Sequence, residues 1–155
     1  MILLDTNVLS EFMRPAPAPQ VVAWLDGQRA DRVWISAITR AEIELGIALL
    51  PDGQRKRGLQ AAANALFEED FAGRCLSFDE RAAAEYARLV ATRTRSGRPI
   101  SVEDAQIAAI GLSRDCTLAT RNTADFAGIE ELDLVDPWQT LQTTPQAAHV
   151  ANLTT

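Results

Sequence analysis

Short apolar segments recur along the chain, mostly separated by stretches long enough for helices, and this alternation limits the possible folds more than any other feature. The apolar and β-branched runs predict strands at Ile2–Leu4, Val33–Ser36, Cys75–Phe78, Thr117–Thr120 and Leu132–Val135. An alternation of strands and helices favours a mainly parallel sheet that is covered by helices on both faces. We therefore predict an α/β fold with three layers, α/β/α, around a central, mainly parallel sheet of four to five strands.

Caps and helix breakers mark the expected helix boundaries. The predicted helices run from Thr6 or Asn7 to before Pro15, over Val21–Leu25, from Ser36 to about Leu50, through Leu59–Phe67, over Asp79–Thr94 and from Ser101 to about Arg114. The turn Pro51-Asp52-Gly53 makes the third and fourth of these a helical hairpin. In open parallel sheets, ligands bind outside the carboxyl ends of the strands, so the residues that follow each strand are the candidates for function.

The length of 155 residues fits one domain, which we place at residues 1–138, and the charge-free tail 139–155 is expected to be partly disordered or loosely docked. No apolar run is long enough for a membrane span, and Asp5 interrupts the N-terminus where a signal peptide needs a hydrophobic stretch. We therefore expect a soluble cytoplasmic protein without a membrane partner. Cys75 and Cys116 are expected to be two separate reduced thiols in the core.

The charge and the single histidine restrict the chemistry. His149 lies in the tail, so the ordered part of the sequence has neither a His/Cys zinc site nor a histidine-based catalytic triad. The net charge of −6 argues against a protein that binds nucleic acid by surface charge alone. This objection weakens if several carboxylates are gathered around metal ions, because a bound cation reverses the local field.

Two carboxylates in the first third of the chain have unusual positions. Asp5 ends the first predicted strand, which places it at the carboxyl edge of the sheet, although an Asp there can equally cap the next helix. Glu42 shares a predicted helical stripe with Ile38, Leu45 and Leu49, so we expect it to point toward the core. A buried carboxylate needs a partner, which is either a metal ion or an arginine such as Arg40 or Arg81.

Two further carboxylates lie in the last third. Asp104 is three residues after Ser101, as in a capping box, and it shares a helical face with Ile107, Ala108 and Gly111. Asp125 follows the fourth predicted strand, in a segment that is equally consistent with a simple turn capped by Asn122 and anchored by Phe126. Three of the four acids belong near one edge of one sheet, and their joint placement indicates a reaction centre formed by Asp5, Glu42, Asp104 and Asp125.

With these residues in view, the sequence resembles the PIN-domain nucleases, and most of all the VapC and FitB toxins of bacterial toxin–antitoxin pairs. The resemblance extends to about Trp138. It depends on four blocks in order, which are Leu4–Glu11, Ser36–Gly46 with Glu42, Asp104 with Ile107–Ala109, and Ala119–Asn122 with Asp125-Phe126.

The resemblance implies a ribonuclease that depends on a divalent metal ion, with the four carboxylates as its acidic set. It also implies supporting roles for Thr6, Asn7, Thr120 and Asn122, a homodimer, an RNA substrate and a small antitoxin that inhibits the enzyme. Oxygen ligands select Mg²⁺ or Mn²⁺, so we expect Asp5 and Asp104 to bind the metal directly and Asp125 to complete the site or bind a second ion. Glu42 is expected to bind through water or to orient the attacking water. The arginines that could contact RNA phosphates are Arg93, Arg95, Arg98 and Arg121.

Two alternatives have different chemistry. A phosphotransfer protein on a similar sheet would need a second aspartate two residues after Asp5, where the sequence has Asn7, or a lysine after a late strand. A PIN-like module that binds RNA or protein without catalysis would retain the shape and lack turnover. Treatment with an acyl-phosphate donor would form a covalent aspartyl phosphate only in the first alternative. RNA binding without cleavage in Mg²⁺ and Mn²⁺ would favour the second.

Overall fold

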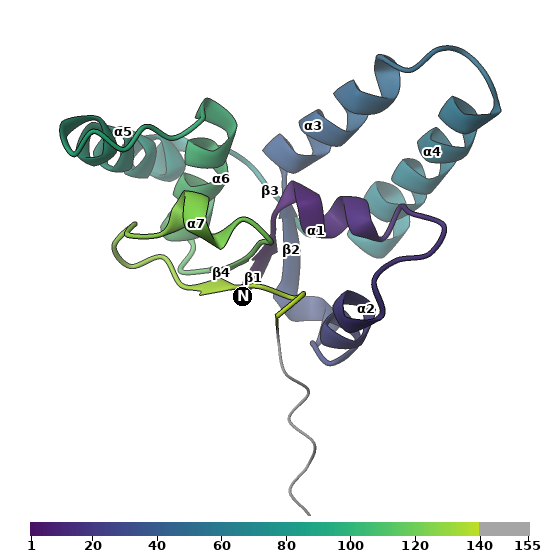
Figure 1. Cartoon of the computed structure of the whole chain (residues 1–155), viewed down its shortest axis with the longest axis horizontal. Coiled ribbons are helices and arrows are strands. Elements are labelled where there is room, and N and C mark those ends of the chain that lie inside the picture. The colour runs from purple at the N-terminus through teal and green to yellow at the C-terminus, as the bar shows by residue number, and fades with distance from the viewer. Residues whose placement is uncertain (140–155) are drawn as a thin grey trace, which may run out of the picture.

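The computed structural model describes residues 1–139 as a twisted parallel sheet with helices on both faces (Figure 1). The strands are β1 (Ile2–Leu4), β2 (Val33–Ser36), β3 (Cys75–Leu76), β4 (Thr117–Ala119) and β5 (Leu134–Val135). Their order is β3-β2-β1-β4-β5, and every neighbouring pair is parallel. The predicted α/β fold with a parallel sheet of four to five strands is therefore confirmed.

The helices follow the predicted caps closely. They are α1 (Thr6–Glu11), α2 (Pro19–Asp26), α3 (Ala37–Ala48), α4 (Gln54–Ala65), α5 (Glu80–Arg95), α6 (Val102–Ser113) and α7 (Thr123–Phe126), with a short 3₁₀ turn at Ala30–Arg32 and a π-helical turn at Leu66–Asp70. Ser36, Asp79 and Ser101 each accept a hydrogen bond from a backbone N–H in the first turn of the helix that follows. Among these helices of residues 1–139, none is long and apolar enough to cross a membrane.

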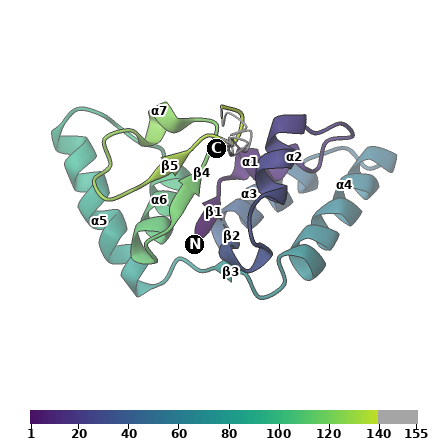
Figure 2. The ribbon, with the colours of Figure 1, turned by 90° about the horizontal axis from the view of Figure 1, so that it is seen from below.

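The two faces of the sheet carry separate apolar cores, because successive residues of a strand point to opposite faces. Leu3 and Leu118 pack with α5, α6 and Phe126 on one face, whereas Leu4 and Ala119 pack with residues of α1, α3 and α4 on the other. Figure 2 shows this division, with α5 and α6 on one side of the strands and α1 to α4 on the other. The carboxyl ends of β1 and β4 therefore lie between two groups of helices.

The cysteine prediction was half wrong. Both thiols are free, and Cys116 is buried, but Cys75 is exposed. Cys75 begins β3, which is an edge strand of the sheet, so that one side of it has no neighbouring strand to cover it. The predicted tail falls almost wholly on residues 140–155, which lie outside the described part of the chain.

Candidate active site

Asp5 is held where β1 ends and α1 begins. Its backbone N–H donates to the Ala119 carbonyl oxygen at 2.9 Å, which continues the pairing of β1 with β4. Its Oδ1 atom accepts a hydrogen bond from the Thr6 N–H at 2.8 Å, and only 4% of the residue is exposed. Capping and a place at the sheet edge were alternatives in the sequence, and Asp5 has both.

A ring of polar groups fixes the other carboxylate oxygen of Asp5. The Thr120 hydroxyl, on a fully buried residue, donates to Asp5 Oδ2 at 2.7 Å. Asn7 Nδ2 donates to Asp5 Oδ2 and to Thr120 Oγ1, at 3.3 Å each. Asn7 Oδ1 in turn accepts from the backbone N–H of Arg121 at 3.2 Å, and Thr120 Oγ1 accepts from that of Asn122 at 3.1 Å. These bonds join the ends of β1 and β4 and set the direction of the Asp5 side chain.

Asn122 contributes to this ring only through its backbone. It precedes α7, but its side chain makes no capping hydrogen bond. The alternative in which Asn122 caps the turn through its side chain is therefore wrong, and its amide is exposed at the edge of the site.

Glu42 extends toward the site from α3 and is held by a threonine, not by one of the predicted arginine partners. Its Oε1 atom accepts a hydrogen bond from the Thr6 hydroxyl at 2.7 Å, and Thr6 Oγ1 also lies 3.0 Å from the hydroxyl of the buried Thr39. The two arginines suggested as partners do not serve, since Arg40 pairs with Glu44 and Glu68 and Arg81 makes no ion pair within residues 1–139.

The expectation that Glu42 points into the core was wrong. The residue is exposed, and the stripe that it shares with Leu45 and Leu49 faces solvent, with those two leucines 60% and 76% exposed. The buried stripe of α3 consists of Thr39, Ile43 and Ile47 instead. Helical periodicity alone could not choose between these stripes, because both carry aliphatic side chains.

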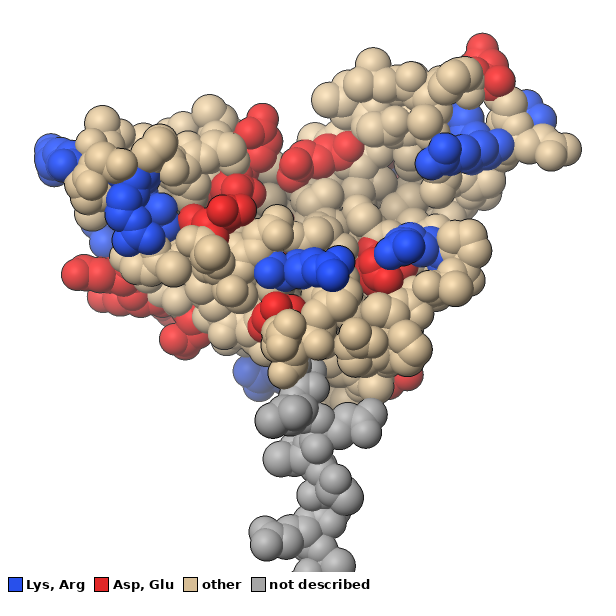
Figure 3. All heavy atoms as spheres, viewed as in Figure 1, with Lys and Arg blue, Asp and Glu red and all other residues tan. Residues whose placement is uncertain are grey.

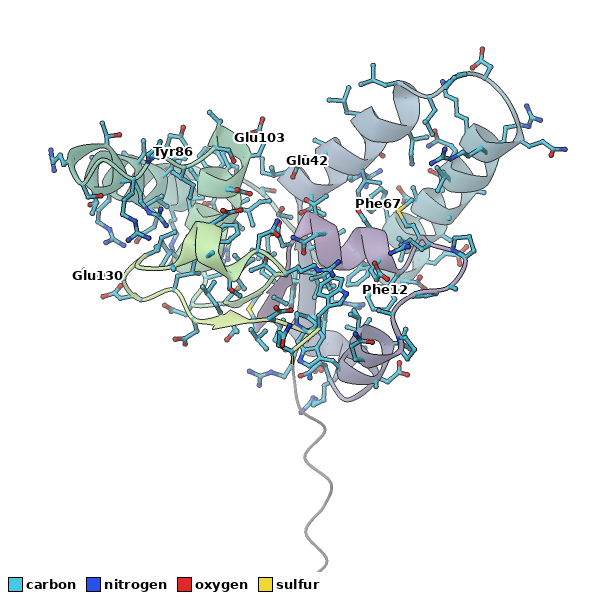
Figure 4. The ribbon with its side chains drawn as sticks, in the orientation of Figure 1. Phe12, Glu42, Phe67, Tyr86, Glu103 and Glu130 are labelled. Carbon is cyan, nitrogen blue, oxygen red and sulfur yellow. The ribbon has the colours of Figure 1, made fainter. Side chains whose placement is uncertain are left out.

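Asp104 lies in the first turn of α6 and its N–H donates to the Ser101 hydroxyl at 3.1 Å. Its side chain is half-buried, on the face that continues to the buried residues Ile107 and Ala108. The neighbouring Glu103 is exposed, as expected. Figure 4 shows Glu103 on α6 and Glu42 on α3. They lie on opposite sides of the opening between these two helices, which we call the notch.

Asp125 belongs to the four-residue helix α7, which Phe126 anchors in the core with 1% of its surface exposed. Asp125 itself is exposed. It lines a pocket of about 440 Å³ together with Asp104. The other lining residues are Arg93, Arg98, Pro99, Ile100, Ser101 and Ala124.

The carboxylates influence one another electrostatically. Burial raises the pKa of Asp5 above its ordinary value, and the charges of Glu42 and Asp125 raise it further, although the Thr120 and Thr6 hydrogen bonds lower it. Burial also raises the pKa of Asp104, and the charges of Asp5 and Asp125 add to this rise. The four acids therefore form one electrostatic unit, as Figure 3 illustrates by the acidic side chains that gather at the notch.

None of the four acids is neutralised by a direct ion pair within residues 1–139, although Arg93 and Arg98 line the pocket that contains Asp104 and Asp125. Buried or clustered carboxylates without a cation are destabilising. A divalent cation would relieve this repulsion, and a set of carboxylate oxygens suits Mg²⁺ or Mn²⁺ better than zinc.

The donor chemistry therefore fits a hard metal ion, but the ligands are not already drawn together around a point. In the described part of the chain, no three acidic, histidine or cysteine side chains lie close enough to hold a metal as they stand. Glu42 and Asp125 are exposed, with Glu42 held by a single hydrogen bond from Thr6, whereas the buried Asp5 accepts hydrogen bonds at both carboxylate oxygens.

The four candidate arginines differ in their surroundings. Arg93 is only 7% exposed and its Nη2 atom donates to two backbone carbonyl oxygens, so its position differs from the RNA-facing one that the sequence suggested. Arg95 is exposed. Arg98 is exposed beside the pocket, and Arg121 stacks over the Trp138 ring with its guanidinium carbon 4.9 Å from the ring centroid. Arg98 and Arg121 therefore remain the better placed for a polyanion.

Comparison with known proteins identifies the family. The family model described as the PIN domain matches residues 2–132. The chain belongs to the PIN-domain family. The resemblance drawn from the four sequence blocks is thus confirmed.

Individual PIN-domain relatives match along almost their whole length. Toxin FitB of Neisseria gonorrhoeae is 44% identical over 138 residues, which cover 89% of this chain and 99% of FitB. VapC ribonuclease Y4jK of Sinorhizobium fredii is 39% identical over 139 residues, which cover 90% of this chain and 99% of the relative. The solved structure of FitAB bound to a DNA fragment matches with a TM-score of 0.83 and 42% identity, over 92% of this chain and 99% of that one.

Thr39 of this PIN-domain site was missed in the sequence, and Arg93 was named there only as a candidate for contact with RNA phosphates. Thr39 lies on the buried stripe of α3 and its hydroxyl contacts that of Thr6, which holds Glu42. Arg93 falls four residues after the buried Leu89, on the buried face of α5, and this spacing was a signal that it faces the protein interior.

Proposed function

We propose that this PIN-domain protein is a ribonuclease that depends on Mg²⁺ or Mn²⁺ and acts as the toxin of a toxin–antitoxin pair. The observation that carries the proposal is the gathering of four electrostatically coupled carboxylates, one of them buried, none of which forms an ion pair within residues 1–139. Relatives named as a toxin and as a VapC ribonuclease support the assignment of the substrate as RNA. A cytoplasmic location follows from this proposal, because cellular RNA is there.

The residues have distinct roles in this proposal. Asp5 and Asp104 would bind the metal directly, and Asp125 would complete the site. The side chains of Asn7 and Thr120 would orient the Asp5 carboxylate, since both donate to its Oδ2 atom, and the Thr120 bond favours its ionised form. When bound, the metal ion supplies the acidification of a water molecule and the neutralisation of charge on the phosphate.

Glu42 is suited to act on water rather than on the metal. It is exposed, and the Thr6 hydroxyl holds its Oε1 atom, which leaves Oε2 available to accept a proton or to orient the attacking water. The exposed guanidinium of Arg98 borders the pocket that contains Asp104 and Asp125, where it could contact a phosphate of the RNA. Arg121, whose backbone N–H donates to Asn7, could contribute a second phosphate contact. The exposed Arg95 could contribute a weaker contact.

We also propose a homodimer and a small basic antitoxin as partners. Leu45 and Leu49 present an apolar stripe to solvent on α3, which suits a protein partner. The net charge of −6 suits a basic inhibitor that reaches the acidic notch. Sedimentation of the purified chain, and co-purification with the product of a short neighbouring reading frame, test these two partners separately.

The ribonuclease proposal is tested with a structured RNA pool. The parent chain is incubated in Mn²⁺ and in chelator, beside Asp104→Asn and the control Glu130→Gln. Glu130 is an exposed acid outside the notch, as Figure 4 shows, so its removal tests whether mere loss of charge matters. We expect cleavage by the parent and by Glu130→Gln in Mn²⁺ only, and none by Asp104→Asn. Binding of RNA without cleavage under all conditions would instead support a non-catalytic module.

A further inference from the structure

Arg93 joins α5 to the segment that carries Asp125. Its Nη2 atom donates to the carbonyl oxygens of Asp125 and Ala127, at 3.0 Å each. These carbonyls lie at the carboxyl end of α7, where the last turn of a helix leaves its acceptors unpaired and partly negative. A cation fits this position well.

The burial of Arg93 requires an explanation beyond packing. The residue is 7% exposed, and none of the ion pairs within residues 1–139 includes its guanidinium. A buried charge without a carboxylate partner is costly unless other groups stabilise it. The two carbonyls do so, and Arg93 also lines the pocket that contains Asp104 and Asp125. Arg93 therefore borders the pocket of the acidic unit while its hydrogen bonds hold the backbone.

A second arginine holds the same segment. Arg98 Nη2 donates to the Ala127 carbonyl oxygen at 3.2 Å. Gly128 follows with a φ of 81°, and a Cβ atom placed there would lie 2.8 Å from Arg98 Nη1. Glycine therefore permits both the backbone conformation and the close approach of the arginine.

The segment has little structure of its own. Helix α7 contains only four residues, and its C-cap, Ala127, is already extended. Phe126 anchors it in the core, but Asp125 and Ala127 are exposed on either side. A helix this short cannot hold a side chain in place unless neighbouring elements support it.

We propose that Arg93 is a positioning residue, which holds the backbone of residues 125–127 so that the Asp125 carboxylate faces Asp5 and Asp104. The inference rests on the proposed function only in assigning Asp125 to the metal site. Removal of Arg93 should then weaken metal binding through Asp125 and release the segment even when no metal is present.

The test uses Arg93→Met and the milder Arg93→Lys, with Arg88→Met as the control on the exposed face of the same helix. Calorimetry with Mn²⁺ alone gives the dissociation constant, and hydrogen exchange of residues 123–128 without metal reports the segment itself. We expect Arg93→Met to weaken Mn²⁺ binding by about 10-fold to 100-fold, as loss of a group that orients a ligand does. Arg93→Lys can keep one carbonyl bond and should recover part of the affinity.

Combination with Asp125→Asn separates positioning from general destabilisation. If Arg93 acts through Asp125, Arg93→Met weakens Mn²⁺ binding no further once Asp125→Asn is present. Gly128→Ala disturbs the same segment from the side of Arg98 and should also accelerate exchange in residues 123–128. An equal loss of affinity in both backgrounds, or a lower melting temperature with unchanged affinity and unchanged exchange, would overturn the proposal.

Failure of the proposed function gives a different pattern. In that case the parent does not bind Mn²⁺, and the exchange measurement alone decides whether Arg93 holds the segment. Faster exchange in Arg93→Met but not in Arg88→Met then supports the positioning role, and equal exchange in the two variants refutes it.

Discussion

The hydrogen bond from Thr120 to Asp5 offers a test of how the site favours the ionised form of a buried carboxylate. The substitution Thr120→Val preserves shape and removes the hydroxyl, which donates to Asp5 Oδ2 at 2.7 Å inside the protein. It also removes the acceptor of two longer bonds, from Asn7 Nδ2 at 3.3 Å and from the Asn122 N–H at 3.1 Å. A hydrogen bond to a charged group contributes about 1.5–3 kcal/mol. For a chain of 155 residues, this loss lowers the melting temperature by about 3–12 °C.

The loss of folding stability in Thr120→Val should be larger at neutral pH than at acidic pH. The pKa of Asp5 is already raised in the folded state by burial, and the Thr120 bond opposes that rise. Loss of the bond raises the pKa further, so the variant is most destabilised above the folded-state pKa, where the carboxyl must be ionised. As the pH falls through that pKa toward the ordinary value of 3.8, the carboxyl takes up a proton and the difference from the parent narrows.

Urea denaturation of the metal-free protein measures this effect, at a series of pH values from neutral down to the acid limit of folding. Thr120→Ser is the matched control, because it keeps the hydroxyl and loses one methyl group. If Thr120→Val and Thr120→Ser are equally stable at neutral pH, or if the cost of Thr120→Val does not change with pH, the assignment of an ionised Asp5 held by this bond is refuted.

Three further predictions concern metal, protons and the turn after α1. Mn²⁺ at about 100 times its dissociation constant should stabilise the parent by about 2.7 kcal/mol, which raises the melting temperature by about 5–11 °C. Asp5→Asn and Asp104→Asn should lose most of this stabilisation. An equal rise in melting temperature in these variants would contradict the proposed ligand set. The stabilisation by Mn²⁺ should decrease as the pH falls, because the raised pKa values of Asp5 and Asp104 allow protons to relieve the carboxylate repulsion that is present above those pKa values. Melting temperatures with and without Mn²⁺ at several pH values measure this. A stabilisation that does not change with pH would refute it. Glu11→Ala removes the buried acceptor of the Ala18 N–H at 2.8 Å and should cost about 1.5–3 kcal/mol in urea denaturation, whereas a neutral effect would show that this bond is dispensable.

The fold was predictable because its signals are local. Ser36, Asp79 and Ser101 cap their helices as their residue types suggest, and the apolar strands alternate with helices throughout residues 1–139. The sequence also placed Asp5 and Asp125 at the carboxyl edge of the sheet, since each follows a strand. The order of strands explains why they meet, because β1 and β4 are neighbours although more than one hundred residues separate them.

What the sequence could not predict depends on long-range contacts. Glu42 and the buried stripe of α3 were assigned to the wrong face, because Leu45 and Leu49 are as apolar as Ile43 and Ile47, and only the packing against the sheet distinguishes them. The hydrogen bonds of Arg93 could not be predicted, because its two acceptors are backbone carbonyls more than thirty residues away. Carbonyl groups occur at every residue, so no residue type signals them.

The central claim is that carboxylates from separate parts of the chain bind one divalent cation around Asp5. A crystal of the full chain grown with Mn²⁺, measured for anomalous scattering, tests this most directly. The account predicts a manganese peak within about 2.5 Å of carboxylate oxygens of both Asp5 and Asp104, with Asp125 turned toward it. A peak bound only at other residues, or no peak at Mn²⁺ concentrations that support RNA cleavage, would contradict it.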